Sequence, residues 1–399
     1  MLVFVLSACA RLLVAVGVLY FSGILLAVWM CLAPVIDPSP LGAAAEALLL
    51  LLALLGFALR SRRTRMLLVT AAVLMAVLHG NARSARVAHM PAAVSERLAA
   101  RPRAVLVTGS TRGIGLQVAR RFAHLGWTVF VHGRSAEAMA ETAARINAEF
   151  AGKAIAVGVG GDLASFRKTR AFCAQVRDHV KSKDLELLVN NAALARIVPA
   201  QLTEDGFDTL MQTNCIAGAL IEQELRQSCP LRRVVHVTSL SSAAASTDAT
   251  VAADLKLSLE NEFGDAAYGR TKLCQIAFAM RPQSDAAPIA VSVHPGGCRT
   301  DMPEDSLSAA FPPPLVPGGW WRRAMRPLTF WVLSRLWFDT AWCAENVVFA
   351  AGAEPVRNGA YFGRFHEMPH LLHSPLQHDA AYTERIQSNI ERAIAPAKA

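Results

Sequence analysis

Short apolar segments alternate with amphipathic segments along residues 104–294, and this alternation is the feature that most constrains the fold. The apolar runs are typical of strands buried on both faces, since a half-exposed strand alternates polar and apolar residues. The amphipathic segments are typical of helices that cover those faces. Strands are predicted at residues 104–108, 128–132, 154–159, 185–189, 234–238 and 289–294, with helices at 116–125, 136–150 and 166–180. The pattern predicts an α/β domain with a doubly wound parallel sheet.

A glycine-rich turn, Thr-Gly-Ser-Thr-Arg-Gly-Ile-Gly, follows the first predicted strand. Glycines between a strand and a helix let the backbone approach a pyrophosphate, whose charge then faces the helix N-terminus. Two glycines could merely make a tight turn, but their place after a strand favours dinucleotide binding. The predicted cofactor contacts in this turn are Gly109, Ser110, Thr111, Arg112, Gly113, Ile114 and Gly115.

Two arginines bear on the choice of dinucleotide. Dinucleotide folds specific for NAD place an acidic residue at the end of the second strand, where this chain has Arg134, and Arg112 lies in the glycine turn. Two guanidinium groups can bind a ribose 2′-phosphate, which an acid would repel. The alternative interpretation is that these arginines are ordinary solvated surface residues. That interpretation explains one such arginine more readily than two at the same site. We therefore expect NADP(H) as the cofactor in preference to NAD.

Further motifs follow the glycine turn in a fixed order, and together they resemble the short-chain dehydrogenase/reductase family over about residues 101–365. The motifs are Asp162-Leu163, Asn190-Asn191-Ala192-Ala193, Asn214, Ser239, Tyr268-Gly269-Arg270-Thr271-Lys272, and Pro295-Gly296 with Thr300. The resemblance implies a Rossmann-type sheet. In addition to Arg134, which the charge argument gives, it implies cofactor contacts at Asp162, Leu163, Asn190, Ala192, Tyr268, Lys272, Pro295, Gly296 and Thr300. One departure is Ala193, where the family usually has glycine.

Tyr268 and Lys272 are four residues apart, so they share a face of a helix. A phenol with a pKa of about 10 exchanges protons poorly at neutral pH, and a neighbouring ammonium lowers that pKa. We expect Tyr268 to be the general acid or base and Lys272 to lower its pKa and hold the ribose. Ser239 would donate a hydrogen bond to the substrate oxygen, with Ser241 and Ser242 as alternatives. Asn214 matches the family residue that positions a water relay to the lysine.

Three stretches look like the retinol dehydrogenase and WW-domain oxidoreductase branch of the family: residues 202–208, 254–255 and 359–362. That resemblance implies a lipophilic alcohol or carbonyl substrate of the retinoid, steroid or lipid class. Two features depart from the branch: Cys215 and its neighbours replace a His-rich stretch, and the helix before Ser239 is about one turn short. Cytosolic NADPH favours reduction as the direction.

Residues 301–338 occupy the position of a mobile lid over the substrate in the family. They contain Trp320-Trp321-Arg322-Arg323 and an apolar run over residues 328–338. The aromatic side chains suit an apolar ligand arriving from a bilayer, and the arginines suit lipid phosphates. Ordinary packing of a C-terminal helix is the alternative interpretation of this segment.

The N-terminal part is apolar enough to predict membrane segments. Residues 12–33 form an uncharged run of 22 residues, and residues 41–59 contain only one acid, Glu46. Each run reaches across a hydrocarbon core of about 30 Å, whereas residues 66–78 are short for a third span. A cleaved signal peptide is the alternative, but the first run exceeds the usual length of about 7 to 15 residues.

The positive charge is local. Nine arginines and one acid lie between residues 60 and 103, within a total net charge of +9. The positive-inside rule places this segment in the cytosol, and the expectation is an integral membrane protein with a cytosolic catalytic domain, the endoplasmic reticulum being favoured. The predicted domains are an anchor at 1–80, a basic linker at 81–103, the NADP-binding domain at 104–370 and a tail at 371–399.

The remaining expectations concern cysteines and partners. Eight scattered cysteines form no CxxC pair and no histidine cluster at ligand spacing, so we expect reduced, buried thiols and no metal site. The expected partners are a lipophilic small molecule and the lipid bilayer, with no nucleic acid, and a homodimer is left open. A non-catalytic nucleotide-binding scaffold or redox sensor is the alternative function.

Overall fold

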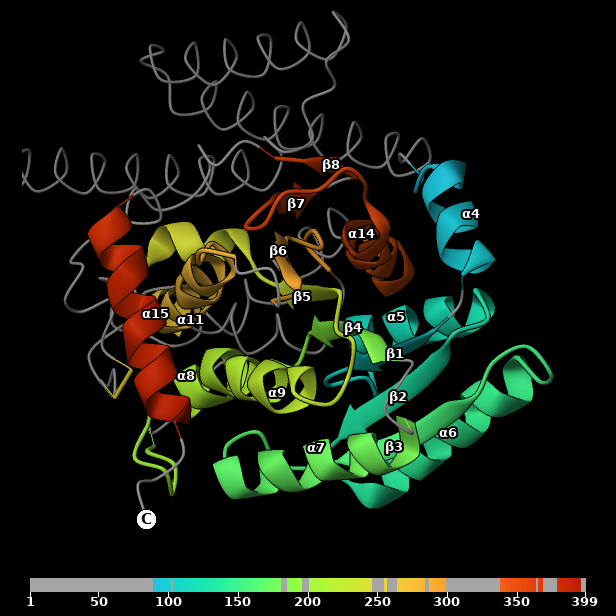
Figure 1. Cartoon of the computed structure of the whole chain (residues 1–399), viewed down its shortest axis with the longest axis horizontal. Helices are drawn as coiled ribbons and strands as arrows, with labels where there is room; N and C mark the ends of the chain where they lie inside the picture. Colours follow the sequence, from blue (N-terminus) through green and yellow to red (C-terminus); the bar gives the residue numbers. More distant parts are fainter. Residues whose placement is uncertain are drawn as a thin grey trace, which may run out of the picture. The chain divides into compact units, whose positions relative to one another are not determined.

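The described strands form one sheet, in the order β3-β2-β1-β4-β5-β6-β7-β8 (Figure 1). The computed structural model describes residues 89–395 except 102, 181–184, 196–200, 246–254, 257–263, 284–286, 299–337, 364 and 369–378. Strands β1 to β7 pair in parallel, and β8 is antiparallel to β7. The strands are β1 (Ala104–Val107), β2 (Thr128–Gly133), β3 (Ala156–Gly160), β4 (Leu185–Asn190), β5 (Arg233–Val237), β6 (Ile289–Val293), β7 (Tyr361–Gly363) and β8 (His366–Glu367).

Helices cover both faces of this sheet, because the central strands are apolar on both sides. One face packs against α4 (Ala92–Ala100), α5 (Gly113–His124), α6 (Ala136–Glu149) and α14 (Thr340–Gly352). The other face packs against α7 (Phe166–Val180), α9 (Ala217–Arg226) and α11 (Gly264–Ala279). Three short helices precede α9 and α11: α8 (Thr209–Met211), the π-helix η2 (Gln212–Ile216) and the 3₁₀ helix η3 (Leu240–Ala244).

This architecture confirms the predicted α/β class and its parallel, Rossmann-like sheet. The six predicted strands and three predicted helices appear within a few residues of their expected bounds. Strands β7 and β8 were not predicted. They extend the sheet beyond β6 through the pair Ser292 and Tyr361, in a stretch too short to show a strand pattern.

The predicted membrane region is corrected. Among the described residues, no helix is both long enough and apolar enough to cross a bilayer. The runs at 12–33, 41–59 and 66–78, on which the prediction of an integral membrane protein rested, lie outside the described residues. The described residues show the α/β class, and the predicted transmembrane region and membrane localisation are withdrawn.

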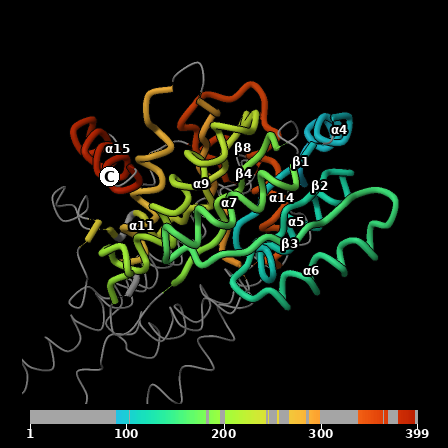
Figure 2. Tube along the Cα trace, turned by 60° about the horizontal axis from the view of Figure 1, so that its bottom comes forward, coloured from blue at the N-terminus to red at the C-terminus, as the bar shows by residue number. Residues whose placement is uncertain are grey.

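Two helices outside the predicted strand-and-helix region pack onto the domain. Helix α4 falls within the predicted linker, and its Leu98 carbonyl accepts a hydrogen bond of 2.9 Å from Trp127 Nε1. Helix α15 (Ala380–Ile394), within the predicted tail, buries Tyr382, Ile386 and Ile390 against α11 and η2. They lie on opposite sides of the domain (Figures 1 and 2). The predicted domain boundaries themselves stay a prediction.

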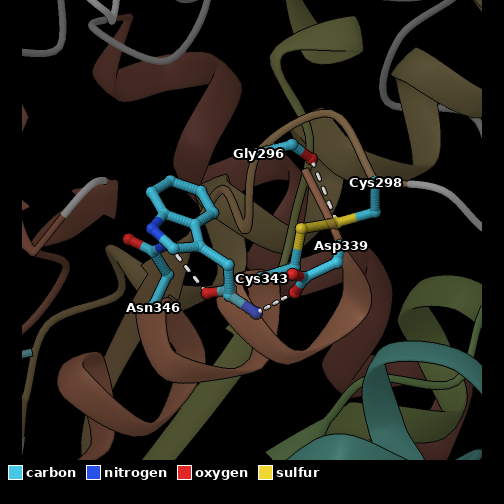
Figure 3. The surroundings of a disulfide bond; sticks show 6 residues. Gly296, Cys298, Asp339, Cys343 and Asn346 are labelled. Atoms are coloured by element: carbon cyan, nitrogen blue, oxygen red, sulfur yellow. Dashed lines mark hydrogen bonds between the residues drawn. A yellow bond between two sulfur atoms is a disulfide. The ribbon is translucent and has the colours of Figure 1, made fainter. Parts of the chain in front are cut away.

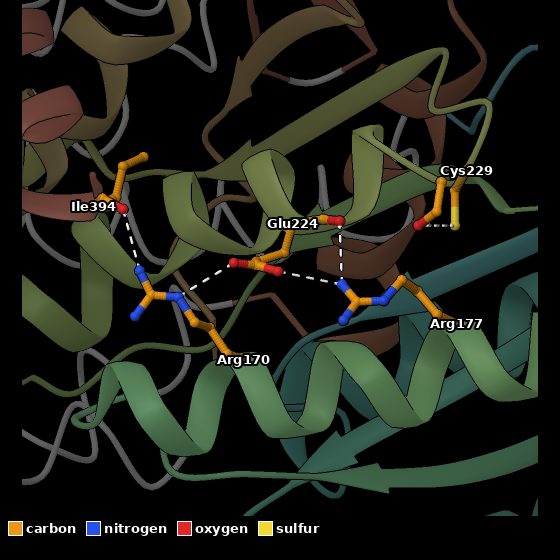
Figure 4. A network of polar contacts seen from close by, with 6 residues as sticks. Arg170, Arg177, Glu224, Cys229 and Ile394 are labelled. Carbon is orange, nitrogen blue, oxygen red and sulfur yellow. Dashed lines mark hydrogen bonds and ion pairs between the residues drawn. The ribbon is translucent and has the colours of Figure 1, made fainter. Parts of the chain in front are cut away.

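A polar network on the α7/α9 face fastens the end of α15. Glu224 on α9 accepts from Arg170 Nε and from Arg177 Nη1, both at 3.2 Å (Figure 4). Arg170 Nη2 also donates to the carbonyl of Ile394 at 3.2 Å. One carboxylate therefore joins two turns of α7, and the same arginine holds the C-terminal turn of α15.

The expectation of reduced cysteines is wrong for one pair. Cys298, after β6, and Cys343, on α14, form a disulfide (Figure 3). Parallel pairing of Cys298 with Phe338 brings the loop after β6 beside the start of α14, and the two Cα atoms lie 6.5 Å apart. The sequence separation of 45 residues hides this proximity. Cys173, Cys215, Cys229 and Cys274 are free and buried, as expected.

Candidate active site

The glycine turn has the backbone that a phosphate site needs. Gly109 and Gly113 have positive φ angles of 63° and 59°, which glycine adopts without strain. A Cβ atom at Gly115 would collide with the carbonyl of Gly109 and the side chain of Asn191. Helix α5 begins here, has no acid in its first turn and receives no side-chain cap from Arg112. Its first amides are therefore suited to an anion.

His132, at the end of β2, joins this turn to the neighbouring strand. Its Nδ1 accepts from the amide of Gly109 at 3.2 Å, and its Nε2 lies 3.1 Å from the carbonyl of Gly161. This pairing assigns the proton to Nε2. Burial lowers the pKa of His132 to about 4, so the ring is neutral at physiological pH. Ser110 completes the connection, because its hydroxyl donates to Val107 and accepts from the His132 amide.

The arginines predicted to select the cofactor lie at the carboxyl ends of neighbouring strands. Arg112 follows β1 and Arg134 follows β2, and both are exposed. Thr111 packs near Gly133, where an added Cβ would lie 2.7 Å from the threonine methyl group. After β3, the Asp162 carboxylate accepts from the amide of Ala164 at 3.1 Å, and Leu163 is buried beside it. Parallel pairing thus places these predicted contacts along one edge of the sheet.

The Asn-Asn-Ala stretch closes the other side of the glycine turn. Asn191 Nδ2 donates to the carbonyls of Thr108 and Gly109, at 2.9 and 3.1 Å. Ala192 lies so close to Gly109 that a Cβ there would be 2.9 Å from the alanine Cα. Asn190 is buried beside Gly218, and its amide group has no hydrogen-bond partner among the described residues. Asn191, which was not among the predicted site residues, therefore fastens the turn directly.

Asn214 lies in the π-helix η2, a rare conformation that often marks functional sites. Its side-chain oxygen accepts from the amide of Leu194 at 2.8 Å. Its nitrogen donates to the carbonyl of Leu194 and to the hydroxyl of Thr271, at 2.9 and 3.1 Å. Asn214 thus connects the loop after β4 to helix α11, one residue before Lys272.

Ser239 follows β5 and caps the 3₁₀ helix η3. Its hydroxyl accepts from the amide of Ser241 at 3.1 Å and lies 3.2 Å from the Ser241 hydroxyl. Gly269 lets this segment approach α11, because a Cβ there would collide with the carbonyl of Ser241. The hydroxyl groups of Ser239 and Ser241 therefore lie close together. The backbone of Ser241 lies against Gly269, which follows Tyr268 on α11.

Tyr268 and Lys272 share one face of α11, as predicted. The Lys272 Nζ atom lies 5.4 Å from the centre of the Tyr268 ring. The same atom donates to the carbonyl of Val237 at 2.8 Å and to Gln275 Oε1 at 2.9 Å. Burial lowers the pKa of Lys272 to about 7. The ammonium thus lies between the last residue of β5 and the tyrosine.

The Pro-Gly stretch after β6 stands beside aromatic side chains. Gly296 has a φ of 106°, and a Cβ there would lie 3.0 Å from the Trp342 ring. Trp342 stacks on Phe338 with ring centres 3.9 Å apart. The disulfide of Cys298 follows directly (Figure 3). Thr300 and residues 301–337 of the predicted lid lie outside the described residues.

The described site residues thus come from the carboxyl ends of β1 to β6, from η2 and from α11. They fit a dinucleotide, because the glycine turn offers an open backbone and a helix N-terminus. Three residues that contribute to the site are absent from the predicted contacts: His132, Asn191 and Gln275. Asn191 lies within the Asn-Asn-Ala-Ala motif itself, and a polar residue one turn after Lys272 is a usable signal for Gln275. The contacts of His132 depend on which strands neighbour each other.

Comparisons with known proteins agree with this geometry. The family model described as short chain dehydrogenase matches residues 103–254. Serine 3-dehydrogenase of Agrobacterium fabrum is 31% identical over 203 residues, which cover 50% of this chain and 73% of that protein. Retinol dehydrogenase 13 of Mus musculus is 31% identical over 209 residues, 50% of this chain and 59% of that protein.

A WW domain-containing oxidoreductase of Danio rerio is 32% identical over 203 residues, which are 48% of each chain. The chain therefore spans about half the length of this relative, and the matches to all three lie within about half of the chain itself.

Proposed function

Because the chain belongs to the short-chain dehydrogenase/reductase family of oxidoreductases, we propose that it interconverts an alcohol and its carbonyl, with Tyr268 exchanging the proton. The observation that carries the proposal is the position of the Lys272 ammonium, 5.4 Å from the Tyr268 ring centre on one face of α11. A bound nicotinamide dinucleotide supplies or accepts the hydride.

The residues of the chain supply the proton chemistry. For reduction, the Tyr268 hydroxyl donates its proton to the carbonyl oxygen as negative charge develops there. The charge of Lys272 stabilises the resulting phenolate, and Ser239 donates a hydrogen bond to the same oxygen. Asn214 keeps the loop after β4 and helix α11 together. Oxidation of an alcohol uses the same groups in reverse.

The finer proposal for the cofactor is NADP(H). Arg112 and Arg134 stand at the ends of adjacent strands, and no acidic residue follows β2 directly. This arrangement supports binding of a ribose 2′-phosphate by two guanidinium groups. Given NADPH as the donor, reduction is the proposed direction.

The finer proposal for the substrate is a lipophilic alcohol or carbonyl compound. Phe338 and Trp342 place stacked aromatic rings beside Gly296, and aromatic side chains suit an apolar ligand. One relative is named retinol dehydrogenase 13, which supports a retinoid-like class.

The experiment is NADPH consumption by the purified full-length chain. Retinal, steroid ketones, long-chain aldehydes and small polar carbonyls are the test substrates, and Tyr268→Phe is the blank. Turnover of a lipophilic class that disappears in Tyr268→Phe, while NADPH binding survives, supports the proposal. NADPH binding without Tyr268-dependent turnover of any substrate would instead favour a non-catalytic nucleotide-binding scaffold.

A further inference from the structure

The ammonium of Lys272 is held from one side by a glutamine that belongs to none of the motifs described above. Gln275 lies three residues further along α11, and its Oε1 accepts from Lys272 Nζ at 2.9 Å. Lys272 and Gln275 are both buried, with 1% and 2% of their surfaces exposed. The second acceptor is the carbonyl of Val237, two residues before Ser239 on the chain. The ammonium is therefore fixed to the last residue of β5, the strand that leads into Ser239.

Apart from these two acceptors, the groups around Lys272 stabilise its positive charge little. The titratable groups that face it are Tyr268 on α11, Cys215 on η2 and His236 on β5. Burial raises the pKa of Cys215 well above its usual value and lowers that of His236 to about 3, so both are neutral at physiological pH. Among the described residues, no carboxylate forms an ion pair with Lys272. An amide oxygen that accepts from the ammonium therefore has a large effect on its protonation.

We infer that Gln275 is a positioning residue, whose amide oxygen holds the Lys272 ammonium at the end of β5 and keeps it charged beside Tyr268. This inference rests on the proposed function. Two of the three ammonium donors are occupied by Gln275 and Val237, which leaves one for the active centre. A leucine at position 275 would fill the space but leave a buried donor unsatisfied.

The first test reads the protonation of Lys272 without turnover. The pKa of Lys272 is measured by an NMR titration of the chain with isotope-labelled lysine, with its signal assigned by Lys272→Met. A hydrogen bond to a charged group corresponds to about one to two pKa units, so Gln275→Leu lowers the pKa by that amount. Gln275→Glu raises it, because a carboxylate replaces the amide oxygen. An unchanged pKa in both variants overturns the inference.

A matched control is available on α15. Gln387 donates to the carbonyl of Ala277, five residues after Lys272 on the same helix α11. Gln387→Leu makes the same chemical change and leaves the Lys272 titration where it is in the wild type. If Gln387→Leu shifts the titration as much as Gln275→Leu does, the effect is general loosening of α11, and the inference is wrong.

The second test is the dependence of kcat on pH in the reductive direction. As Lys272 loses its proton, the phenolate loses its support and activity falls. Gln275→Leu moves this fall about one to two pH units lower, which reduces kcat at about pH 8 by tenfold or more, and Gln275→Glu moves it upward. If the variants shift the pKa of Lys272 but the chain shows no Tyr268-dependent turnover, the contact between Gln275 and Lys272 is supported and the proposed reaction is contradicted. Normal turnover with an unshifted profile in both variants removes only the inference.

Discussion

In the proposed binding of NADP(H), Arg112 and Arg134 bind the ribose 2′-phosphate of the cofactor. Each guanidinium can form charge-assisted hydrogen bonds with a phosphate, and solvent exposure reduces their contribution. We expect Arg112→Ala and Arg134→Ala each to lower kcat/KM for NADPH by about tenfold and to leave kcat/KM for NADH almost unchanged. Steady-state kinetics with both cofactors provide the measurement. Arg145→Ala, an exposed arginine on α6, is the control, and equal losses with both cofactors would contradict the assignment.

His132 connects the glycine turn to the segment after β3, two segments that are proposed to bind the cofactor. Its replacement by phenylalanine leaves the Gly109 amide and the Gly161 carbonyl without their ring partner. Each hydrogen bond lost at a buried group costs about 1 to 3 kcal/mol of free energy. Part of this loss destabilises the conformation of the turn that binds the cofactor. We expect His132→Phe to weaken NADPH binding about tenfold or more in a fluorescence titration. His124→Asn, an exposed histidine on α5, should bind as the wild type does; the same affinity in His132→Phe would show that the turn forms without the ring.

At the level of the elements, the sequence is most informative where one local property decides the structure. The strands from β1 to β6 are predictable because each apolar run is bounded by turn residues, and the glycine turn because a Cβ at Gly115 has no room. Contacts between elements that lie far apart in the sequence are harder to predict from it. The hydrogen bond from His132 to Gly161 depends on strand order, and the disulfide between Cys298 and Cys343 depends on the loop after β6 running beside α14.

The disulfide between Cys298 and Cys343 is expected to stabilise the folded chain. It closes a segment of 45 residues that connects β6 to α14, and a cross-link of such a loop typically contributes about 2–4 kcal/mol. We expect the double variant Cys298→Ala/Cys343→Ala to lower the free energy of unfolding by that order, as measured by denaturant titration. Dithiothreitol should destabilise the wild type and not the variant. If the untreated wild type reacts with a thiol reagent at Cys298 after unfolding, the bond is absent.

For the whole molecule, two buried histidines make stability depend on pH. Burial lowers the pKa of His132 to about 4 and that of His236 to about 3, below the usual histidine value of about 6.5. The unfolded chain therefore binds protons below about pH 6.5 that the folded chain takes up only near pH 4 and pH 3. Their contribution to stability is complete above pH 6.5 and is lost as the pH falls through this window, by several kcal/mol in total.

His236 allows this effect to be isolated, because neither of its ring nitrogens has a hydrogen-bond partner among the described residues. Replacement by leucine removes the titration without breaking a hydrogen bond. Between about pH 6 and pH 4, the slope of unfolding free energy against pH should fall by about 1.4 kcal/mol per pH unit, the value for one proton. Val234→Ala, a cavity variant on the same strand, should lower stability at every pH and keep the wild-type slope. A slope in His236→Leu equal to that of the wild type would mean that the folded chain accepts a proton on His236, and that water reaches this face of the sheet beneath α11.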